Sequence, residues 1–133
     1  MLHMLDTNIV SYIIKGHSPN VEKELSNIPP EMTCISVITR AELLYGLKKL
    51  PETNRLHLAV RQFFKIIRIL SWDSDAANFY AEIRHQLTQD GQGIGEMDMM
   101  IAAHSLSASA ILVTNNIRHF DRIQLPLTLK NWV

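Results

Sequence analysis

The chain has 133 residues, of which 47% are hydrophobic and 20% charged, as is typical of a globular protein with one substantial core. Thirteen basic and thirteen acidic residues give a formal net charge of zero, which argues against a protein that coats nucleic acid but allows a local basic rim. The single cysteine, Cys34, excludes an internal disulfide framework and is expected in the core. No signal peptide or membrane-spanning run is visible, so we expect one cytoplasmic domain over residues 1–133.

Short apolar runs alternate with helical patterns along the first half of the chain. Residues 1–5 predict a buried strand, and Thr7 or Asn8 is expected to cap the helix that follows. Lys15-Gly16 is typical of a helix end. The next elements are expected to be a helix over 20–27, a strand over 33–37, a helix over 39–50, and a helix from about 56 to 64 capped by Thr53.

The second half continues the same alternation. We expect a strand over 66–70, a helix over 76–89, a helix over 96–107, a strand over 110–114 and an edge strand near 127–129. The glycine-rich stretch 90–95 does not follow a strand, so we interpret it as a lead-in to a helix and not as a phosphate-binding loop. This alternation predicts an α/β fold with a central parallel sheet of four to five strands, covered by helices on both faces.

Two polar positions directly follow predicted strands. Asp6 follows the first strand, and Thr114-Asn115-Asn116 lie at the end of the strand predicted over 110–114. In open parallel sheets, functional sites form where the carboxyl ends of the strands meet. The position of Asp6 is equally consistent with a helix cap and with a metal ligand.

Two more acids occur in segments that otherwise resemble core. Glu42 lies in a predicted helix, where a solvated surface glutamate is the more common outcome. Asp98 begins a helix that is apolar nearly all round. Contact with the helix dipole is the structural alternative for Asp98, but Glu96 already places a negative charge in the same turn, which favours a functional role for Asp98.

Asp6, Glu42 and Asp98 together predict one shared cation site. Two carboxylates ~4 Å apart repel by roughly 4 kcal/mol at an effective dielectric constant near 20, so converging acids need protons or a metal ion. Oxygen ligands favour Mg²⁺, with Mn²⁺ as the alternative. The six histidines are scattered without zinc spacing, and no serine–histidine–aspartate arrangement is present.

Four segments in this order resemble the PIN-domain ribonucleases, and more narrowly the VapC toxins of bacterial type II toxin–antitoxin modules. These segments are Met4 to Asn8, Ile38 to Gly46, Gly95 to His104, and Leu112 to Phe120. Among those toxins, the enteric members that cut initiator tRNA in its anticodon loop are the most similar. The resemblance extends over the whole chain.

The resemblance implies that Asp6, Glu42 and Asp98 form an acidic Mg²⁺ site. Many PIN domains carry a fourth acid after the fourth strand, where this chain has Thr114-Asn115-Asn116, so Glu96 becomes the candidate for a further metal ligand. Candidates for contacts behind the site or with the RNA phosphates are Thr7, Asn8, Thr114, Asn116 and Arg118. His119 and Arg122 are expected to line the same rim, and Lys48, Lys49 and Arg55 form a second basic cluster.

The resemblance also implies a VapB-like antitoxin whose C-terminal tail blocks the acidic site. A groove that includes Ile9, Ile13 and Ile14 is the expected binding surface for that tail. Toxin homodimers within a larger toxin–antitoxin assembly are expected, with tRNA as substrate, inhibition of translation as the outcome, and DNA contacted only through the antitoxin. No membrane partner is expected.

Two alternative functions stay open at this point. One is a catalytically silent PIN-like interaction module, against which the complete set of three acids argues. The other is a metal-dependent nuclease that acts on another nucleic acid, although the chain has no added module for DNA binding.

Overall fold

A five-stranded parallel sheet forms the centre of the computed structural model, which describes residues 1–133. The strand order is β3-β2-β1-β4-β5, and every neighbouring pair is parallel. The strands are β1 (His3–Leu5), β2 (Thr33–Ser36), β3 (Arg68–Leu70), β4 (Ile111–Val113) and β5 (Leu129–Lys130). The prediction of a parallel sheet with four to five strands is therefore confirmed.

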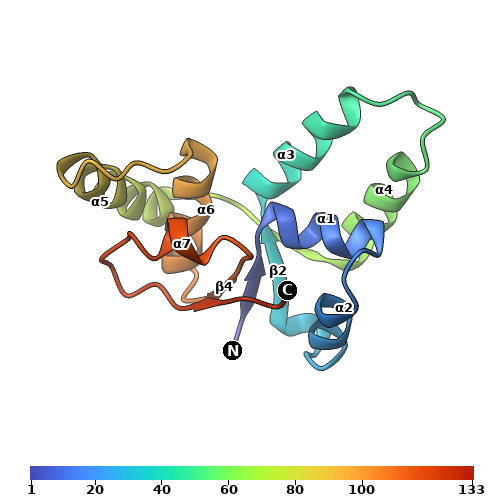
Figure 1. Cartoon of the computed structure of the whole chain (residues 1–133), viewed down its shortest axis with the longest axis horizontal. Coiled ribbons are helices and arrows are strands. Elements are labelled where there is room, and N and C mark those ends of the chain that lie inside the picture. The colour runs from blue at the N-terminus through green and yellow to red at the C-terminus, as the bar shows by residue number, and fades with distance from the viewer.

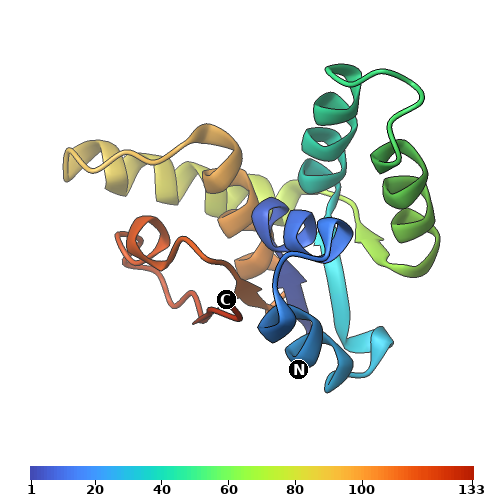
Figure 2. The same cartoon turned by 45° about the vertical axis from the view of Figure 1, so that its right-hand side comes forward.

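Helices cover both faces of this sheet, as Figure 1 shows. They are α1 (Thr7–Lys15), α2 (Pro19–Ser26), α3 (Val37–Lys48), α4 (Leu56–Ile66), α5 (Ser74–Gln89), α6 (Glu96–Ser107) and α7 (Ile117–Phe120), with a 3-10 turn at Pro30–Met32. Helices α3 and α4 project from one side as an antiparallel pair, and α5 with the start of α6 projects from the other (Figure 2). No helix is long and apolar enough to cross a membrane.

The alternation of side chains along each strand divides the core into two layers. On β1, Met4 packs with α5 and α6, whereas Leu5 packs with α1, α3 and α4. On β2, Cys34 faces the first layer and Ile35 the second, and Leu112 and Val113 repeat this pattern on β4. A parallel sheet with both faces buried needs such continuous apolar strands, which is why the strands were visible in the sequence.

The helix starts follow local capping chemistry. Asp6 caps α1, because its Oδ1 accepts a hydrogen bond from the Ile9 backbone N–H at 2.9 Å, so Thr7 and Asn8 do not act as the cap. Ser36 caps α3, and the helix therefore begins at Val37, two residues earlier than predicted. The predicted Thr53 cap of α4 is wrong: the Asn54 side chain accepts from the Leu56 N–H instead.

Three other local predictions have clear outcomes. Gly16 ends α1 in the left-handed conformation, with φ of 68°, as the Lys15-Gly16 pair predicted. The last strand lies at Leu129–Lys130, slightly beyond the predicted 127–129. Cys34 is fully buried, and burial raises the pKa of its thiol to about 12, so it is an unreactive core residue as expected.

Candidate active site

Asp6 lies at the carboxyl end of the central strand β1 and is 4% exposed. Its backbone N–H donates to the Val113 carbonyl at 3.0 Å, which fixes its place beside β4. The pKa of the carboxyl group is raised to about 6, mainly by burial and to a smaller extent by the charges of Asp98 and Glu42. Hydrogen bonds from the Thr114 hydroxyl and the Ile9 N–H act in the opposite direction. Asp6 is thus both the cap of α1 and an acid whose pKa is raised well above its ordinary value.

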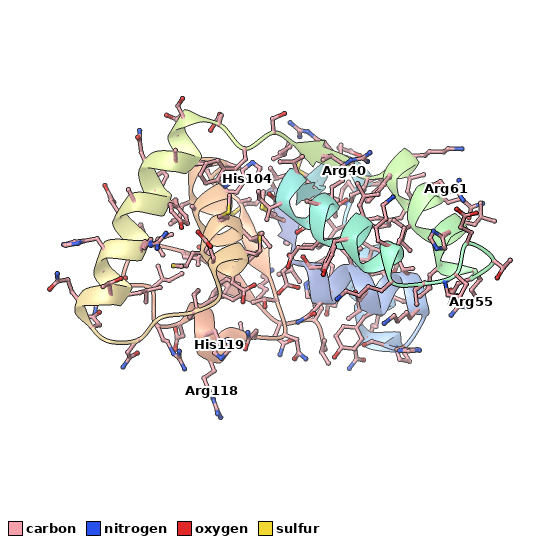
Figure 3. All side chains as sticks on the ribbon, turned by 90° about the horizontal axis from the view of Figure 1, so that it is seen from above. Arg40, Arg55, Arg61, His104, Arg118 and His119 are labelled. Carbon is pink, nitrogen blue, oxygen red and sulfur yellow. The ribbon has the colours of Figure 1, made fainter.

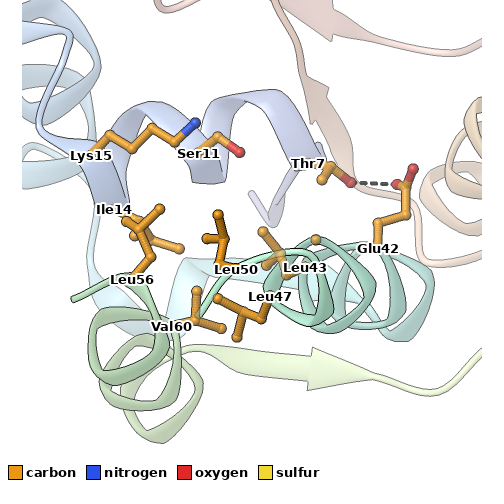
Figure 4. Close-up of a pocket in the computed structure, with 11 residues that line it drawn as sticks. Thr7, Ser11, Ile14, Lys15, Glu42, Leu43, Leu47, Leu50, Leu56 and Val60 are labelled. Atoms are coloured by element: carbon orange, nitrogen blue, oxygen red, sulfur yellow. Dashed lines mark hydrogen bonds between the residues drawn. The ribbon is translucent and has the colours of Figure 1, made fainter. Parts of the chain in front are cut away.

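Glu42 is half-buried on α3, one turn after the start of the helix. Its Oε1 accepts a hydrogen bond from the Thr7 hydroxyl at 2.6 Å, as Figure 4 shows. The Thr7 and Thr39 hydroxyl oxygens are 3.2 Å apart, and because Thr7 has one hydroxyl hydrogen, Thr39 donates in this second bond. Thr7 on α1 therefore holds Glu42 directly, and Thr39 on α3 supports Thr7.

Asp98 is half-buried in the first turn of α6. Burial and the charge of Glu42 raise the pKa of its carboxyl group, whereas the neighbouring His119 lowers it. No hydrogen bond contributes to this shift, so the Asp98 oxygens remain available for another partner.

The three acids lie within electrostatic reach of one another at the carboxyl edge of the sheet. Each of the raised pKa values includes a contribution from another member of the set. No three His, Cys, Asp or Glu side chains stand in positions that would together hold a metal ion in this structure. Hard carboxylate oxygens with partial burial nevertheless fit Mg²⁺ or Mn²⁺ in chemical type.

The segment after β4 contributes a chain of polar contacts beside the acids. Thr114 is fully buried, and its Oγ1 accepts a hydrogen bond from the Asn116 backbone N–H at 2.9 Å. The Asn116 amide Nδ2 lies 2.7 Å from His119 Nδ1. Asn116 is therefore engaged with His119 in this structure.

Glu96 differs from its predicted role as a further acid at a buried site. It is exposed, and its Oε1 accepts from the Tyr80 hydroxyl at 3.0 Å and pairs with Arg84 at 3.5 Å. These partners belong to α5, so the exposed Glu96 carboxylate is drawn toward that helix. The first turn of α6 therefore carries one half-buried acid, Asp98, and one exposed acid, Glu96, and the metal-ligand role of Glu96 stays a prediction.

The predicted basic rim consists of Arg118, His119 and Arg122, and only some of these side chains are free in the structure. Arg118 is exposed and points away from the body of the protein, close to His119 (Figure 3). Arg122 donates to the Gly93 carbonyl at 3.2 Å and so ties the 90–95 loop to the segment after α7. Asn8 is exposed on α1, where it lines a shallow hollow with Ser11 and Lys15.

A cleft of about 180 Å³ runs between α1, α3 and α4 and ends at Thr7 and Glu42 (Figure 4). Its apolar lining comes from Ile14, Leu43, Leu47, Leu50, Leu56 and Val60, and Lys15 lies at the end away from Glu42. Ile9 was expected in this groove, but it is fully buried in the core and unavailable to a partner. Ile13 packs at the edge of the same core layer, so of the three predicted isoleucines only Ile14 lines the cleft.

Two residues near the acids were missed or underrated from the sequence. Thr39 lies three positions before Glu42, on the same helical face. This spacing was the signal in the sequence that could have placed the Thr39 hydroxyl near the hydrogen bond between Thr7 and Glu42. His119 was expected on the rim, but nothing in the sequence places its ring beside Asp98 and Asn116.

Comparison with known proteins identifies the family. The PIN domain family matches residues 3–125, and the chain belongs to this family. Its relatives include Ribonuclease VapC2 of Haemophilus influenzae, 38% identical over 131 residues and 98% of each chain. The tRNA(fMet)-specific endonuclease VapC of Shigella flexneri is 38% identical over 120 residues and 90% of each chain.

Solved structures agree with this assignment over the full length of the chain. VapBC from Salmonella typhimurium bound to DNA has a chain that superimposes with a TM-score of 0.91 and 35% identity, covering 100% of both chains. VapBC2 from Rickettsia felis, bound to a DNA fragment from its promoter, gives a TM-score of 0.90 with the same identity and coverage. The similarity is therefore to the VapC members of the PIN domain family.

Proposed function

We propose that this protein is the toxin of a type II toxin–antitoxin pair and a metal-dependent endoribonuclease whose substrate is tRNA, with the anticodon loop of initiator tRNA as the expected site. Cleavage there inhibits translation. The observation that carries the proposal is the convergence of Asp6, Glu42 and Asp98 from three separate elements at one sheet edge. The names of the VapC relatives support the substrate class.

Asp6, Glu42 and Asp98 are the residues that would hold Mg²⁺, with Mn²⁺ as the alternative ion. The ion supplies charge stabilisation at the phosphate and lowers the pKa of a bound water. Asp98, whose carboxylate is free of hydrogen bonds, and Glu42, which Thr7 holds, are the candidates to orient the attacking water. Arg118, exposed on the same rim, is available for the RNA backbone.

The partner in this proposal is a VapB-like antitoxin. The cleft between α1, α3 and α4 offers an apolar floor that leads to Glu42, which suits an apolar segment followed by an arginine or lysine. The similar VapBC structures are complexes with DNA, and we propose that DNA contact comes through the antitoxin. A toxin homodimer within the assembly is part of the same proposal.

The test is cleavage of a total tRNA pool by the antitoxin-free protein, with the cut ends mapped. We expect one Mg²⁺-dependent cut that EDTA abolishes and that Asp6→Asn and Asp98→Asn both lack. Asp75→Asn is the matched control, because Asp75 is an exposed first-turn acid on α5. Equal cleavage in excess EDTA would contradict the metal site. The absence of any cleavage by a folded wild-type protein would favour a silent interaction module, and a cut confined to DNA or other RNA would change the substrate class.

A further inference from the structure

The segment after β4 fixes the chemical state of one side chain next to the acids. Asn116 Nδ2 lies 2.7 Å from His119 Nδ1. With the amide oriented as it is in this structure, Nδ2 donates and His119 Nδ1 accepts through its lone pair. The ring proton of the neutral imidazole is therefore on Nε2.

The second ring nitrogen, Nε2, has no partner within the protein. The only buried side-chain nitrogen or oxygen atoms without a hydrogen bond are those of His3, so the half-buried His119 presents Nε2 to solvent. The His119 ring also lies within electrostatic reach of Asp98. An N–H donor thus stands free at the margin of three acids.

A free donor at this place fits an anion that approaches the acids. The acids themselves repel a phosphate, and His119 together with the exposed Arg118 are the donors on α7 that could offset this repulsion. Arg118 points away from the body of the protein, whereas His119 is half-buried beside Asp98 (Figure 3). His119 is consequently the better placed of the two for the phosphate at the cleavage point.

We propose that His119 is a catalytic residue that donates a hydrogen bond from Nε2–H to the phosphate of the bound RNA, and that Asn116 is the positioning residue that sets this tautomer. The inference rests on the proposed nuclease function. It gives Asn116 a role other than metal ligation at a place where many PIN domains carry an acid. A carboxylate at 116 would accept from Nδ1 and so favour the opposite tautomer, which leaves Nε2 without its proton.

A pair of substitutions separates the two ring nitrogens. In His119→Gln the amide NH₂ takes the place of Nε2, whereas in His119→Asn it takes the place of Nδ1. We expect His119→Asn to lower kcat/KM for tRNA cleavage by about 10- to 100-fold, the usual effect of losing a hydrogen bond to a charged group. His119→Gln should recover most of this loss. The matched control is His85→Asn on the exposed face of α5, which should behave as wild type.

Binding is measured separately, in an Asp6→Asn background that does not cleave. There His119→Asn should weaken tRNA affinity about tenfold or more, and His119→Gln should not. The tautomer is measured in the wild-type protein by long-range ¹⁵N–¹H NMR of the His119 ring. We expect a protonated Nε2 in the wild type, and a shift of the proton toward Nδ1 in Asn116→Asp with a parallel loss of tRNA affinity.

Several results would overturn the inference. Equal activity in His119→Asn and wild type, or equal losses in the Asn and Gln variants, would remove the Nε2 donor from the reaction. A wild-type ring protonated on Nδ1 would contradict the geometry. If the wild-type protein cuts no RNA, the proposed function itself fails, and this outcome is distinct from normal cleavage in all the His119 variants.

Discussion

At the scale of single residues, Asp6 combines a structural and a chemical role that oppose each other. Its carboxylate caps α1, yet burial raises its pKa from 3.8 to about 6. A raised pKa means that the folded protein binds the proton more tightly than the unfolded chain does. In the absence of metal, the contribution of Asp6 to the free energy of unfolding is therefore most favourable below about pH 4. This contribution falls as the pH rises from about 4 to about 6, and above about pH 6 the full cost of the buried charge is present.

The first prediction concerns Asp6→Asn in EDTA. The amide keeps the cap acceptor for the Ile9 N–H and removes the buried charge, so the variant should be more stable than wild type by about 2 kcal/mol at pH 7.5. The difference should shrink toward zero near pH 4. Urea denaturation across this pH range measures both.

Asp73→Asn is the control for this prediction, because Asp73 caps α5 in the same way at an exposed position. It should change stability by less than about 0.5 kcal/mol. Added Mg²⁺ should stabilise the wild type and not Asp6→Asn. A destabilised Asp6→Asn protein at pH 7.5 would show that capping dominates the energetics of this residue.

The second prediction concerns the Thr7 hydroxyl, which donates to Glu42 at 2.6 Å. Thr7→Val keeps the shape and removes the donor, so Glu42 loses its support and cleavage should fall about tenfold. Thr7→Ser restores the hydroxyl and should keep most of the activity. Thr88→Val, on the exposed face of α5, is the surface control. Equal activity in Thr7→Val and Thr7→Ser would mean that the metal alone positions Glu42.

At the scale of elements, one buried contact connects the two helices that carry Glu42 and Asp98. His104 on α6 is 3% exposed, and its Nδ1 lies 2.7 Å from Ser36 Oγ, the cap of α3. Burial lowers the pKa of His104, so the ring is neutral at physiological pH. This hydrogen bond therefore joins α6 to the start of α3.

The third prediction compares two serine caps. Ser36→Ala removes the α3 cap and also leaves His104 Nδ1 without its partner, so it should cost about 2–3 kcal/mol. Ser18→Ala removes only the α2 cap and should cost about 1 kcal/mol. Chemical denaturation of both variants measures the difference. Equal costs would mean that the His104 contact contributes nothing to stability.

The elements were largely predictable because their signals are local. Apolar strands and the helix end at Gly16 each depend on signals within a few residues, and these predictions are confirmed. The contacts around the acids were not predictable in the same way. Glu96 turns toward Tyr80 and Arg84 because the fold brings α5 near the start of α6. Sequence pattern therefore identified the acids but not their neighbours.

At the scale of the whole molecule, the cleft between α1, α3 and α4 allows the antitoxin proposal to be tested apart from catalysis. Gly46 lines this cleft within α3, and a Cβ added there meets no atom within 4 Å. Gly46→Leu would fill part of the cleft, and we expect it to weaken antitoxin binding about tenfold while the antitoxin-free variant still cuts tRNA.

Gly46→Ala is the matched control for the fourth prediction. It leaves most of the cleft open and should raise stability by about 0.5–1 kcal/mol, since glycine is unfavourable inside a helix. Titration calorimetry with the antitoxin and a tRNA cleavage assay measure the two effects. Unchanged antitoxin affinity in Gly46→Leu would place the antitoxin elsewhere.

The position of β1 in the middle of the sheet has a consequence for biosynthesis. The first strand to leave the ribosome pairs with β2 on one side, but its other neighbour, β4, is made only when the chain is nearly complete. Thr114, which binds Asp6, arrives later still. Pairing between such distant segments is a slow step in folding. The arrangement around Asp6 therefore forms only after the β4 segment has been made, so the proposed cleavage site is completed late in synthesis.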